Sequence, residues 1–597
     1  MFFRIGGWLI LSFILAGCSS QAEEQVPEAA PTKTTQQPPV ADRVFINGNI
    51  YRFNWPAPQG NGKPHRGAPF GPNGWRANAQ AIAVSGGKVL AVGANDDVRH
   101  YITELTEVVD LKNATVLPGL IDSHVHIEQL AEKLAIADLA GVDTPQQAVA
   151  RLTEFVRLNP LAPNEWLLGD GWDEGRWAAA LPTRHLLDAA FPERPVVLKS
   201  RHGFAVWANS AALLAAGISA QVPDPVGGEI VRDADGNPSG ILLNRATPLM
   251  LQKIPVITAK QYQQRLLKAM QVMANSGFVA IHQAGADQVL LQHLQILAEQ
   301  GQLPLRVYVY LSSRDQPLMS QWLARGPEVD PNGWLDVRGV KAYYDGSLGA
   351  RGALLLKPYS DKPGHLGTGG PQYQYPAEQV EQAFESGFQL AIHAIGDGGN
   401  RAVLDIFARQ QGLPAAAHNR RHRIEHAQVL APSDIPRLGQ LGVLASMEPL
   451  HALSDRHWAL QRLGTQRIDG AYAWRSLRES GATLLLNSDL PGTDYQFKSV
   501  VYAAITRQDE QQLPSGGWYP QQRLSVEEAI WGYSRAPAFA MFREQQLGQI
   551  SPGFWADFTV VDQDIMRLAA NNAEQILSTQ ILMTVIHGRQ VFLAPAQ

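Results

Sequence analysis

The sequence predicts an α/β fold in which a (β/α)8 TIM barrel carries a composite β-sandwich formed by both ends of the chain. Three observations support this prediction. Eight short apolar strand candidates run through the middle of the sequence, and most are separated by helix-like stretches, which is typical of a closed parallel barrel. Paired β runs with Gly-rich turns occur near both ends of the chain. The length of 597 residues exceeds what one ordinary core can organise, so a second unit is expected.

The barrel is expected over residues 116–544. Its strand candidates are 117–126, 278–282, 306–311, 337–344, 389–393, 423–426, 443–447 and 483–489. The helix-like stretches are 261–275, 288–300, 377–386, 401–410 and 471–479. A doubly wound open sheet is the alternative, but no Gly-rich phosphate fingerprint follows a strand.

An insertion at residues 138–256 separates the first barrel strand from the second and is far longer than a normal crossover. It is rich in Trp, Pro and Gly, and residues 227–236 have the pattern of a hairpin. Such an insertion is more typical of a lid or pocket wall than of a disordered linker. The composite sandwich is expected over residues 42–115 and 545–597, with strand candidates at 44–46, 81–84, 89–92, 556–561 and 584–592.

The first residues have the pattern of a secretory signal. Arg4 precedes an apolar run at residues 5–16, which is too short for an ordinary spanning helix and ends in small residues. The phrase Leu-Ala-Gly-Cys at 15–18 resembles a bacterial lipobox, which implies a signal peptide over 1–17 and a lipid on Cys18. An uncleaved membrane anchor is the alternative.

The residue after the cysteine is Ser19 rather than the Asp of an inner-membrane retention signal, which favours an outer-membrane lipoprotein facing the periplasm. Residues 18–41 lack the apolar content to pack and are expected to form a lipidated flexible tether. Cys18 is the only cysteine, so the chain can form no internal disulfide and has no other thiol for zinc or for nucleophilic catalysis.

The composition points to a small-molecule partner. Hydrophobic residues make up 45% of the chain and charged residues 18%, as in a folded, core-rich protein. The net charge of −5 gives no electrostatic case for binding nucleic acid or anionic membrane surfaces. The sequence does not indicate the oligomeric state.

Metal-binding side chains gather at the predicted ends of the barrel strands. His124 and His126 end the first strand and are spaced so that both imidazoles point to one side, although an isolated pair of this kind can also be structural. The other strands supply His282, Lys341, His393, His426 and Asp489. In a barrel, the C-terminal strand ends meet at one face, where active sites lie. Histidine and carboxylate without thiolate suit Zn²⁺ or a similar divalent ion.

The order of these residues resembles that of the amidohydrolase superfamily. The phrases KAYYDGSLGAR at 341–351, HAIGD at 393–397 and RIEHA at 423–427 are similar to those of amidohydrolase family 3, which includes N-substituted formamide deformylases. PGLIDSH at 118–124 and the terminal sheet also fit, so the resemblance covers nearly everything from residue 42 onward.

This resemblance implies a site with two divalent ions, zinc by preference, bridged by a Lys341 that CO2 has carbamylated. His124, His126 and Asp489 would bind one ion, and His393 and His426 the other. The implied reaction is hydrolysis of a carbon–nitrogen bond in a non-peptide amide, N-formyl or N-acyl amine. A hydroxide held by the ions attacks the carbonyl, and Asp489 passes its proton to the departing amine.

Several residues are candidates for substrate contact. By position in the family, His202 and His451 lie near the pocket, where each could contact substrate or pack within a loop. Arg351 could hold a carbonyl or carboxylate, with a solvated salt bridge as the alternative. His282 is followed by Gln283, where family members often carry Asp, so a structural role is an equal alternative. Trp172, with Trp177, could wall an apolar pocket, with core packing as the alternative.

Two other functions stay open. A mononuclear deaminase of the same superfamily relies on a catalytic Glu in a His-x-x-Glu arrangement, whereas Gln, Ala and Gly follow His282 here. A surface lipoprotein that binds a ligand without chemistry is the other alternative. A binding protein has no reason to keep Asp489 as a proton carrier, which favours an enzyme.

Overall fold

The computed structural model describes residues 40–595 except 164, 178–180 and 411–419. The predicted signal peptide and nearly all of the predicted tether lie outside the described residues. The described part forms one compact unit, Val40–Gln597. None of its helices is both long and apolar enough to cross a membrane.

Eight parallel strands form the barrel sheet, and their order around the sheet follows their order in the chain. They are β9 (Leu120–Val125), β16 (Phe278–Ala286), β17 (Arg306–Ser312), β18 (Leu335–Tyr343), β19 (Gln389–Ala394), β20 (Arg423–His426), β21 (Leu444–Met447) and β22 (Leu484–Leu486). The sheet closes where Val125 bridges Leu490 in parallel and the His126 amide donates to the Leu490 carbonyl at 3.0 Å. The predicted TIM barrel is therefore confirmed.

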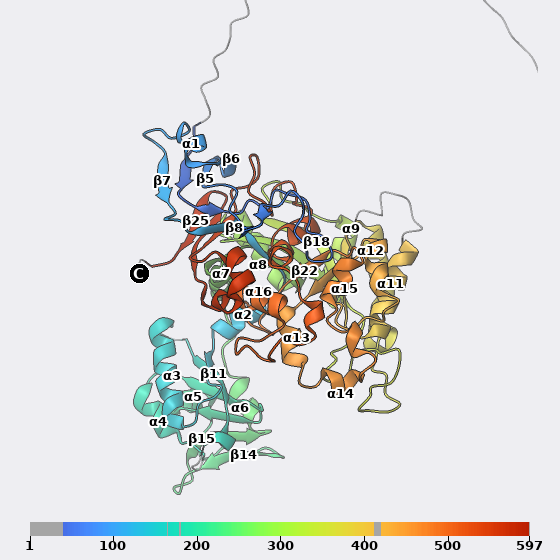
Figure 1. The fold of residues 1–597 in the computed structure, drawn as a ribbon. Coiled ribbons are helices and arrows are strands. Elements are labelled where there is room, and N and C mark those ends of the chain that lie inside the picture. Colours follow the sequence, from blue (N-terminus) through green and yellow to red (C-terminus); the bar gives the residue numbers. More distant parts are fainter. Residues whose placement is uncertain (1–39, 164, 178–180, 411–419, 596–597) are drawn as a thin grey trace, which may run out of the picture. The chain divides into compact units, whose positions relative to one another are not determined.

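Helices run between the barrel strands and after the last of them (Figure 1). They are α2 (Ile127–Leu134), α7 (Ala259–Asn275), α8 (Gln288–Glu299), α9 (Gln316–Arg325), α10 (Ala377–Glu385), α11 (Asp397–Gln410), α12 (Ile435–Leu441), α13 (Pro449–Asp455), α14 (Ala459–Leu463), α15 (Trp474–Glu479), α16 (Phe497–Thr506), α17 (Val526–Gly532), α18 (Arg535–Ala540) and α19 (Ile565–Asn571). Side-chain caps fix where α7 and α8 begin: Thr258 accepts from the Gln261 amide, and Asp287 accepts from the Leu290 amide.

The predicted first barrel strand is divided in two. β8 (Thr115–Pro118) pairs with the terminal sheet, and only β9, which begins after Gly119, belongs to the barrel. A Cβ at Gly119 would lie 2.5 Å from Cγ2 of Val279, so the glycine allows the chain to pass closely over β16 at this change of sheet. The terminal sheet thus extends past residue 115, the expected end of its first segment.

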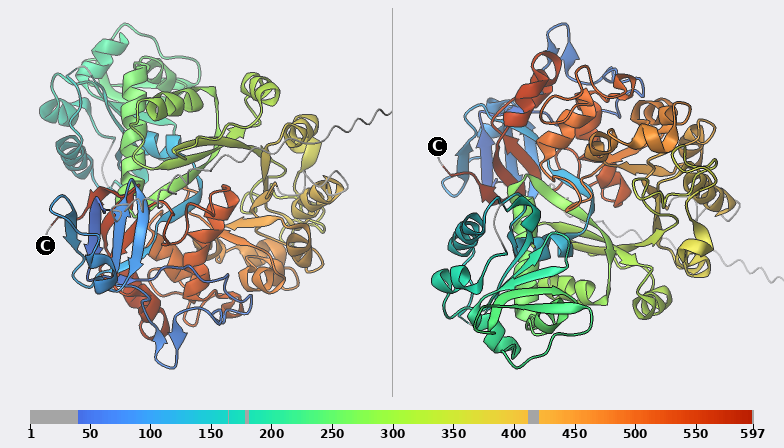
Figure 2. Two further views of the ribbon diagram at one scale, coloured as in Figure 1. Left: turned by 90° about the horizontal axis from the view of Figure 1, so that it is seen from above. Right: turned by 90° about the horizontal axis from the view of Figure 1, so that it is seen from below.

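Both ends of the chain contribute to one sheet, as predicted. The five-stranded sheet contains β2 (Asn49–Ile50), β8, β23 (Phe558–Val561), β24 (Ile581–Ile586) and β25 (Arg589–Leu593). The blue and red strands lie side by side in both views of Figure 2. A four-stranded sheet of β1 (Arg43–Ile46), β5 (Ala81–Ser85), β6 (Lys88–Gly93) and β7 (Glu107–Asp110) lies against it, with α1 (Asn95–Arg99) beside β6. Phe45 meets Phe558 edge to face between them at 4.9 Å.

A buried ion pair joins the terminal sheet to the barrel. Nε of Arg306 on β17 donates to Oδ2 of Asp557 at 2.7 Å, and both side chains are almost fully buried. The Arg306 guanidinium also lies 3.9 Å from the ring centroid of Trp555. Near the first strands, β3 (Phe70–Gly71) and β4 (Gly74–Trp75) form a small hairpin.

The predicted insertion is a folded α/β segment with its own cores (teal in Figure 1). Its six-stranded sheet contains β10 (Ala137–Asp138), β11 (Leu167–Trp172), β12 (Val196–Ser200), β13 (Ala205–Ala208), β14 (Gly228–Arg232) and β15 (Pro238–Asn244). Its helices are α3 (Pro145–Leu158), α4 (Arg184–Ala190), α5 (Ser210–Ala216) and α6 (Thr247–Leu251). β14 and β15 form the expected hairpin.

Candidate metal centre

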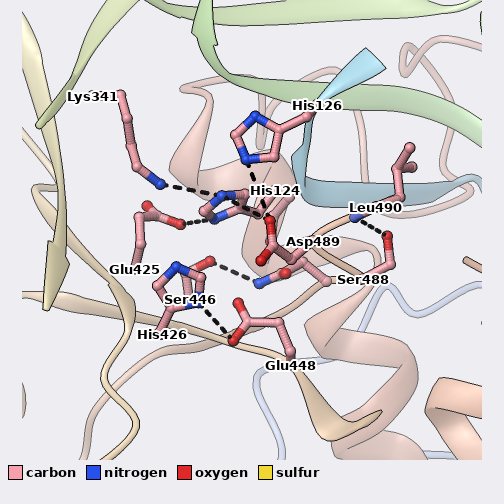
Figure 3. A network of polar contacts seen from close by, with 12 residues as sticks. His124, His126, Lys341, Glu425, His426, Ser446, Glu448, Ser488, Asp489 and Leu490 are labelled. Atoms are coloured by element: carbon pink, nitrogen blue, oxygen red, sulfur yellow. Dashed lines mark hydrogen bonds and ion pairs between the residues drawn. The ribbon is translucent and has the colours of Figure 1, made fainter. Parts of the chain in front are cut away.

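The C-terminal ends of the barrel strands converge on one cavity of about 460 Å³. Six residues that the sequence selects as metal ligands all line it: His124, His126, Lys341, His393, His426 and Asp489. Figure 3 labels all of them except His393, with the Lys341 amine directed at the His124 ring and Asp489 between the first two histidines and His426. The barrel therefore brings together residues that are up to 365 positions apart in the chain.

The first strand and the last strand supply one set of donor atoms. Nε2 of His126 lies 3.3 Å from Oδ1 of Asp489, and Nε2 of His124 lies 3.4 Å from the same oxygen. Each of the three residues offers an atom within 4.8 Å of the others, as ligands of one ion require. A second set that meets this criterion is His426, His451 and Asp489.

Asp489 has a strained backbone, with φ of 49° three residues after β22. Its amide donates to the His124 carbonyl at 3.0 Å, which holds it across the closing seam of the barrel. Burial alone would raise the pKa of Asp489, but the charge of His124 and the hydrogen bond with His126 lower it well below its usual range. Asp489 is therefore an anion at neutral pH, as a metal ligand must be.

His124 is oriented by a buried carboxylate. Its Nδ1 lies 2.5 Å from Oε2 of Glu425, which fixes the tautomer that protonates Nδ1 and leaves the lone pair on Nε2 facing the cavity. Glu425 in turn accepts from Arg423, whose Nη2 lies 2.8 Å from Oε2. The Arg423 guanidinium also donates to the Ser123 carbonyl at 2.6 Å and to Ser446 Oγ at 2.9 Å.

His426 has the same kind of support from Glu448. Nδ1 of His426 lies 3.0 Å from Oε2 of Glu448, so its Nε2 is left for a ligand. The backbone of His426 has φ of 74°, which turns the chain sharply as β20 ends. Glu448 also lies 3.3 Å from Nδ1 of His451. Burial lowers the pKa of His451, but the hydrogen bond and charge of Glu448 outweigh it and raise the pKa to about 9.

His393 completes the histidine set. Its ring lies 4.6 Å from that of His426, centroid to centroid, and among the described residues its buried Nε2 has no hydrogen-bond partner. That nitrogen lies 3.8 Å from Oδ1 of Asp345. Asp345 accepts from the amides of Leu354, Ile395 and Gly396, each at 2.9 Å, and burial raises its pKa to about 7. Asp345 thus organises the loops around His393 rather than facing the cavity.

Lys341 is a buried amine without a carboxylate partner. Its Nζ lies 3.1 Å from Nε2 of His124 and 5.2 Å from the centroid of the Tyr343 ring. No carboxylate oxygen lies within 4 Å of it in the part of the chain that the structure describes. Burial lowers the pKa of Lys341 to about 8, although Glu425 and Asp489 oppose the shift. The neutral amine is therefore easier to form here than in an exposed lysine.

The residues considered for substrate contact fall in different places. His451 lines the cavity. His282 is fully buried, and its Nδ1 accepts from Nη1 of Arg423 at 3.1 Å. Arg351 pairs with Asp361, Nη2 to Oδ2, at 2.8 Å, outside the cavity lining.

Two of these candidates lie in the insertion, and neither is among the residues that line the cavity. The Trp172 side chain is fully buried in the insertion core, stacks on Trp177 at 5.1 Å and donates from Nε1 to the Leu198 carbonyl at 3.0 Å. His202 is exposed and its Nδ1 accepts from the Phe204 amide at 3.0 Å. The cavity lining given by the described residues contains no side chain of the insertion, so the expected role as a pocket wall is not seen.

Sequence reasoning assigns no role to two carboxylates that the structure places beside candidate ligand histidines. Glu425 stands one residue before His426, and strand alternation alone would put these two side chains on opposite faces. The positive φ of His426 breaks that alternation. The only sequence signal for Glu425 is Arg423, two residues away on the same face of a strand, and no comparable signal indicates Glu448.

Comparisons with known proteins give the family. The model described as "Amidohydrolase family" matches residues 107–592. The chain is 31% identical to Protein LONG AFTER FAR-RED 3 of Arabidopsis thaliana over 93% of this chain and 92% of the relative. It is 30% identical to the putative amidohydrolase YtcJ of Bacillus subtilis, with 86% and 96% covered. N-substituted formamide deformylase of Arthrobacter pascens is 27% identical, with 85% and 94% covered.

A solved structure agrees with this relationship. An uncharacterized metal-dependent hydrolase from Pyrococcus horikoshii OT3 superposes with a TM-score of 0.65 at 26% identity, over 88% of this chain and 98% of that one. The barrel, the histidine and carboxylate donors at its strand ends and the match across most of the sequence agree with one another. The chain belongs to the amidohydrolase family and is a metal-dependent hydrolase.

Proposed function

We propose that the protein hydrolyses a carbon–nitrogen bond in a non-peptide amide, an N-formyl amine or an N-acyl amine at a pair of divalent ions. The observation that carries this proposal is the environment of Lys341. A buried ammonium with no anion beside it is costly, whereas a carbamate on the same nitrogen would be an anion suited to bridge two cations. The imidazole nitrogens and the Asp489 carboxylate in the same cavity support the conversion of Lys341 from an ammonium to a carbamate.

The side chains present fit such a centre. Nε2 of His124 and Nε2 of His426 are left unprotonated by the carboxylates on their other nitrogens, as metal-ligating histidines need to be. His124, His126 and Asp489 would hold one ion, and His393 and His426 the other, with the Lys341 carbamate between them. Imidazole and carboxylate donors without thiolate suit zinc.

Bound ions of this kind polarise a carbonyl and lower the pKa of water so that it serves as a nucleophile at neutral pH. The chain supplies the proton transfer. Asp489, ionised and next to both histidines of the first strand, takes the proton of the attacking water on a carboxylate oxygen. It then delivers that proton to the departing amine nitrogen, which is a poor leaving group unless protonated.

Two findings favour carbon–nitrogen substrates. The Arthrobacter pascens relative is named as a deformylase of N-substituted formamides. The Asp489 carboxylate lies 3.3–3.4 Å from His126 and His124, where it would serve as a proton carrier, and an amine leaving group needs one more than an alcohol does. A small-molecule amide is thus the proposed partner.

A substrate panel tests the proposal. The chain from residue 19 onward, loaded with zinc, is assayed with N-formyl amines, N-acetyl amines, N-acyl amino acids and cyclic amides. We expect turnover of at least one class and a loss of about 10²- to 10⁴-fold in kcat for Asp489→Asn, assayed with enough zinc to restore full metal occupancy. Turnover of esters alone, or near-normal amide turnover by Asp489→Asn, would contradict the proposal.

We further propose that the protein acts in the cell envelope, attached through a lipid on Cys18 to the outer membrane and facing the periplasm. The support is the sequence of the first residues, with its charged start, short apolar run and Leu-Ala-Gly-Cys phrase. An enzyme held there would meet small amides that enter from outside the cell.

A further inference from the structure

The outer part of the metal-centre cavity contains a carboxylate that the proposed reaction does not use. Asp455 is the last residue of α13, one helical turn beyond His451, and it lines the same cavity. Nε2 of His451 lies 3.9 Å from Oδ2 of Asp489. His451 thus connects Asp455, one turn away on the same helix, to the candidate metal ligands. A substrate whose carbonyl lies at the donors would extend its amine substituent past His451 toward Asp455.

Hydrogen bonds hold the Asp455 carboxylate in place. Its Oδ2 accepts from the Tyr472 hydroxyl at 2.6 Å and from Nε2 of Gln428 at 2.7 Å. Its Oδ1 accepts from Ser454 at 3.2 Å. All three partners donate, as partners of an ionised carboxylate must. No arginine or lysine forms an ion pair with Asp455 among the described residues. Burial raises the pKa of Asp455, whereas the hydrogen bond from Tyr472 and the charge of His451 lower it.

Aromatic rings lie in the same cavity wall. Tyr343 and Trp458 line the cavity, and Gly349 allows the close approach of Trp458, because a Cβ there would lie 3.2 Å from Cζ2 of the indole. A carboxylate together with aromatic faces is a setting that favours an ammonium group or a neutral ring over an anion.

The nearby cations are held elsewhere. Arg351 and Arg462 both bind Asp361, and neither lines the cavity. Arg314 stacks on Tyr343 with its guanidinium 3.8 Å from the ring centroid, and it too is outside the lining. Apart from Lys341 at the metal donors, the lining formed by the described residues contains no lysine or arginine. His451 also lines the cavity and is a cation at neutral pH, because its pKa is raised to about 9. Its charge is already compensated by Glu448 at 3.3 Å and Asp489 at 3.9 Å.

We propose that the outer part of the cavity selects substrates whose amine portion is neutral or cationic, and that Asp455 is the residue that excludes a carboxylate there. This inference rests on the proposed function for the place of the scissile bond. It separates N-acyl amines, which the site should accept, from N-acyl amino acids, which it should reject.

Three matched substrates test the selection: N-formylbenzylamine and its analogues with an aminomethyl or a carboxylate group in the para position. In the wild type we expect kcat/KM for the cationic analogue to exceed that for the anionic one by at least about tenfold, which is about 1.4 kcal/mol. Asp455→Asn should reduce this ratio at least about fivefold while changing the neutral substrate less than about threefold. Arg314→Ala removes a nearby charge that does not line the cavity and should leave the ratio unchanged.

A binding measurement keeps the inference separate from the proposed reaction. Titration calorimetry of the zinc-loaded protein with 1,4-bis(aminomethyl)benzene and with 4-(aminomethyl)benzoate measures the same preference without turnover. Tighter binding of the diamine, reduced by Asp455→Asn, supports the selection even if no amide is hydrolysed. Equal or tighter binding of the carboxylate would overturn it, as would amide turnover with no preference between the charged substrates.

Discussion

Replacing Glu425 with glutamine should weaken both the fold and the metal centre. Glu425 is almost fully buried and receives the Arg423 guanidinium as well as Nδ1 of His124 at 2.5 Å. The substitution removes the only carboxylate that pairs with Arg423 among the described residues. Breaking a buried pair by removing one partner costs about 3–5 kcal/mol, because the other charge stays buried. We expect a loss of this size in the free energy of unfolding.

The same change should lower metal affinity. A carboxylate that orients a ligand histidine contributes about 10- to 100-fold to affinity, so the first ion should bind more weakly by this factor. Urea unfolding of the metal-free protein measures the stability, and competition with a chromophoric chelator measures the affinity. Glu107→Gln is the matched control, because it breaks an exposed Arg–Glu pair with Arg43 and should cost less than about 1 kcal/mol.

The contribution of Glu425 to the free energy of unfolding should depend on pH. Burial would raise the pKa of Glu425, but the charges of Arg423 and His124 lower it well below its ordinary value of about 4.3. The stability that Glu425 contributes is therefore present above about pH 4.3 and is lost as the pH falls toward the folded-state pKa. The glutamine variant should lack this acid-dependent loss. Unchanged stability and zinc affinity in the variant would refute the assigned role of Glu425.

Three other outcomes are expected. In the metal-free protein, His451 contributes at most about 3 kcal/mol to the free energy of unfolding; this contribution is complete below about pH 6.5 and is lost as the pH rises through about 9. His451→Gln should remove it, and an unchanged pH profile of urea unfolding would contradict this. Asp557→Asn should lower the free energy of unfolding by about 3–5 kcal/mol by leaving Arg306 unpaired at the joint of barrel and sheet, whereas a loss below about 1 kcal/mol would show that the pair is dispensable. Cys18→Ser should move the protein from the membrane to the soluble fraction after cell lysis, and unchanged attachment would count against a lipid anchor.

The barrel could be predicted from the sequence because its strands are short apolar runs at regular intervals. All eight strand candidates overlap observed strands. Strand ends were harder to place: the predicted eighth strand extends to Asp489, whereas β22 ends at Leu486 and Asp489 has positive φ. Side-chain alternation along a strand does not predict the direction of a residue whose backbone leaves the strand conformation. Asp489 and His426, both with positive φ, are residues of this kind.

The candidate ligands could be predicted because a parallel barrel brings all its C-terminal strand ends to one face. The residues that surround them could not. The positions of Glu448 and Asp455 depend on how α13 packs after β21, which no local pattern specifies. For Trp172 the sequence leaves a pocket wall and core packing open, because composition does not distinguish them. The structure places this side chain in the core of the insertion, as the second of these alternatives expects.

The metal content of the wild type and of Lys341→Ala tests the proposed centre most directly. Both proteins are stripped of metal, reloaded with zinc in the presence of ¹³C-labelled bicarbonate, and measured by elemental analysis and by ¹³C NMR. We predict two zinc ions per chain and a carbamate carbon signal in the wild type, with the signal absent and metal binding reduced in Lys341→Ala. One ion per chain in both proteins, with no carbamate signal in the wild type, would contradict the bridged two-metal site.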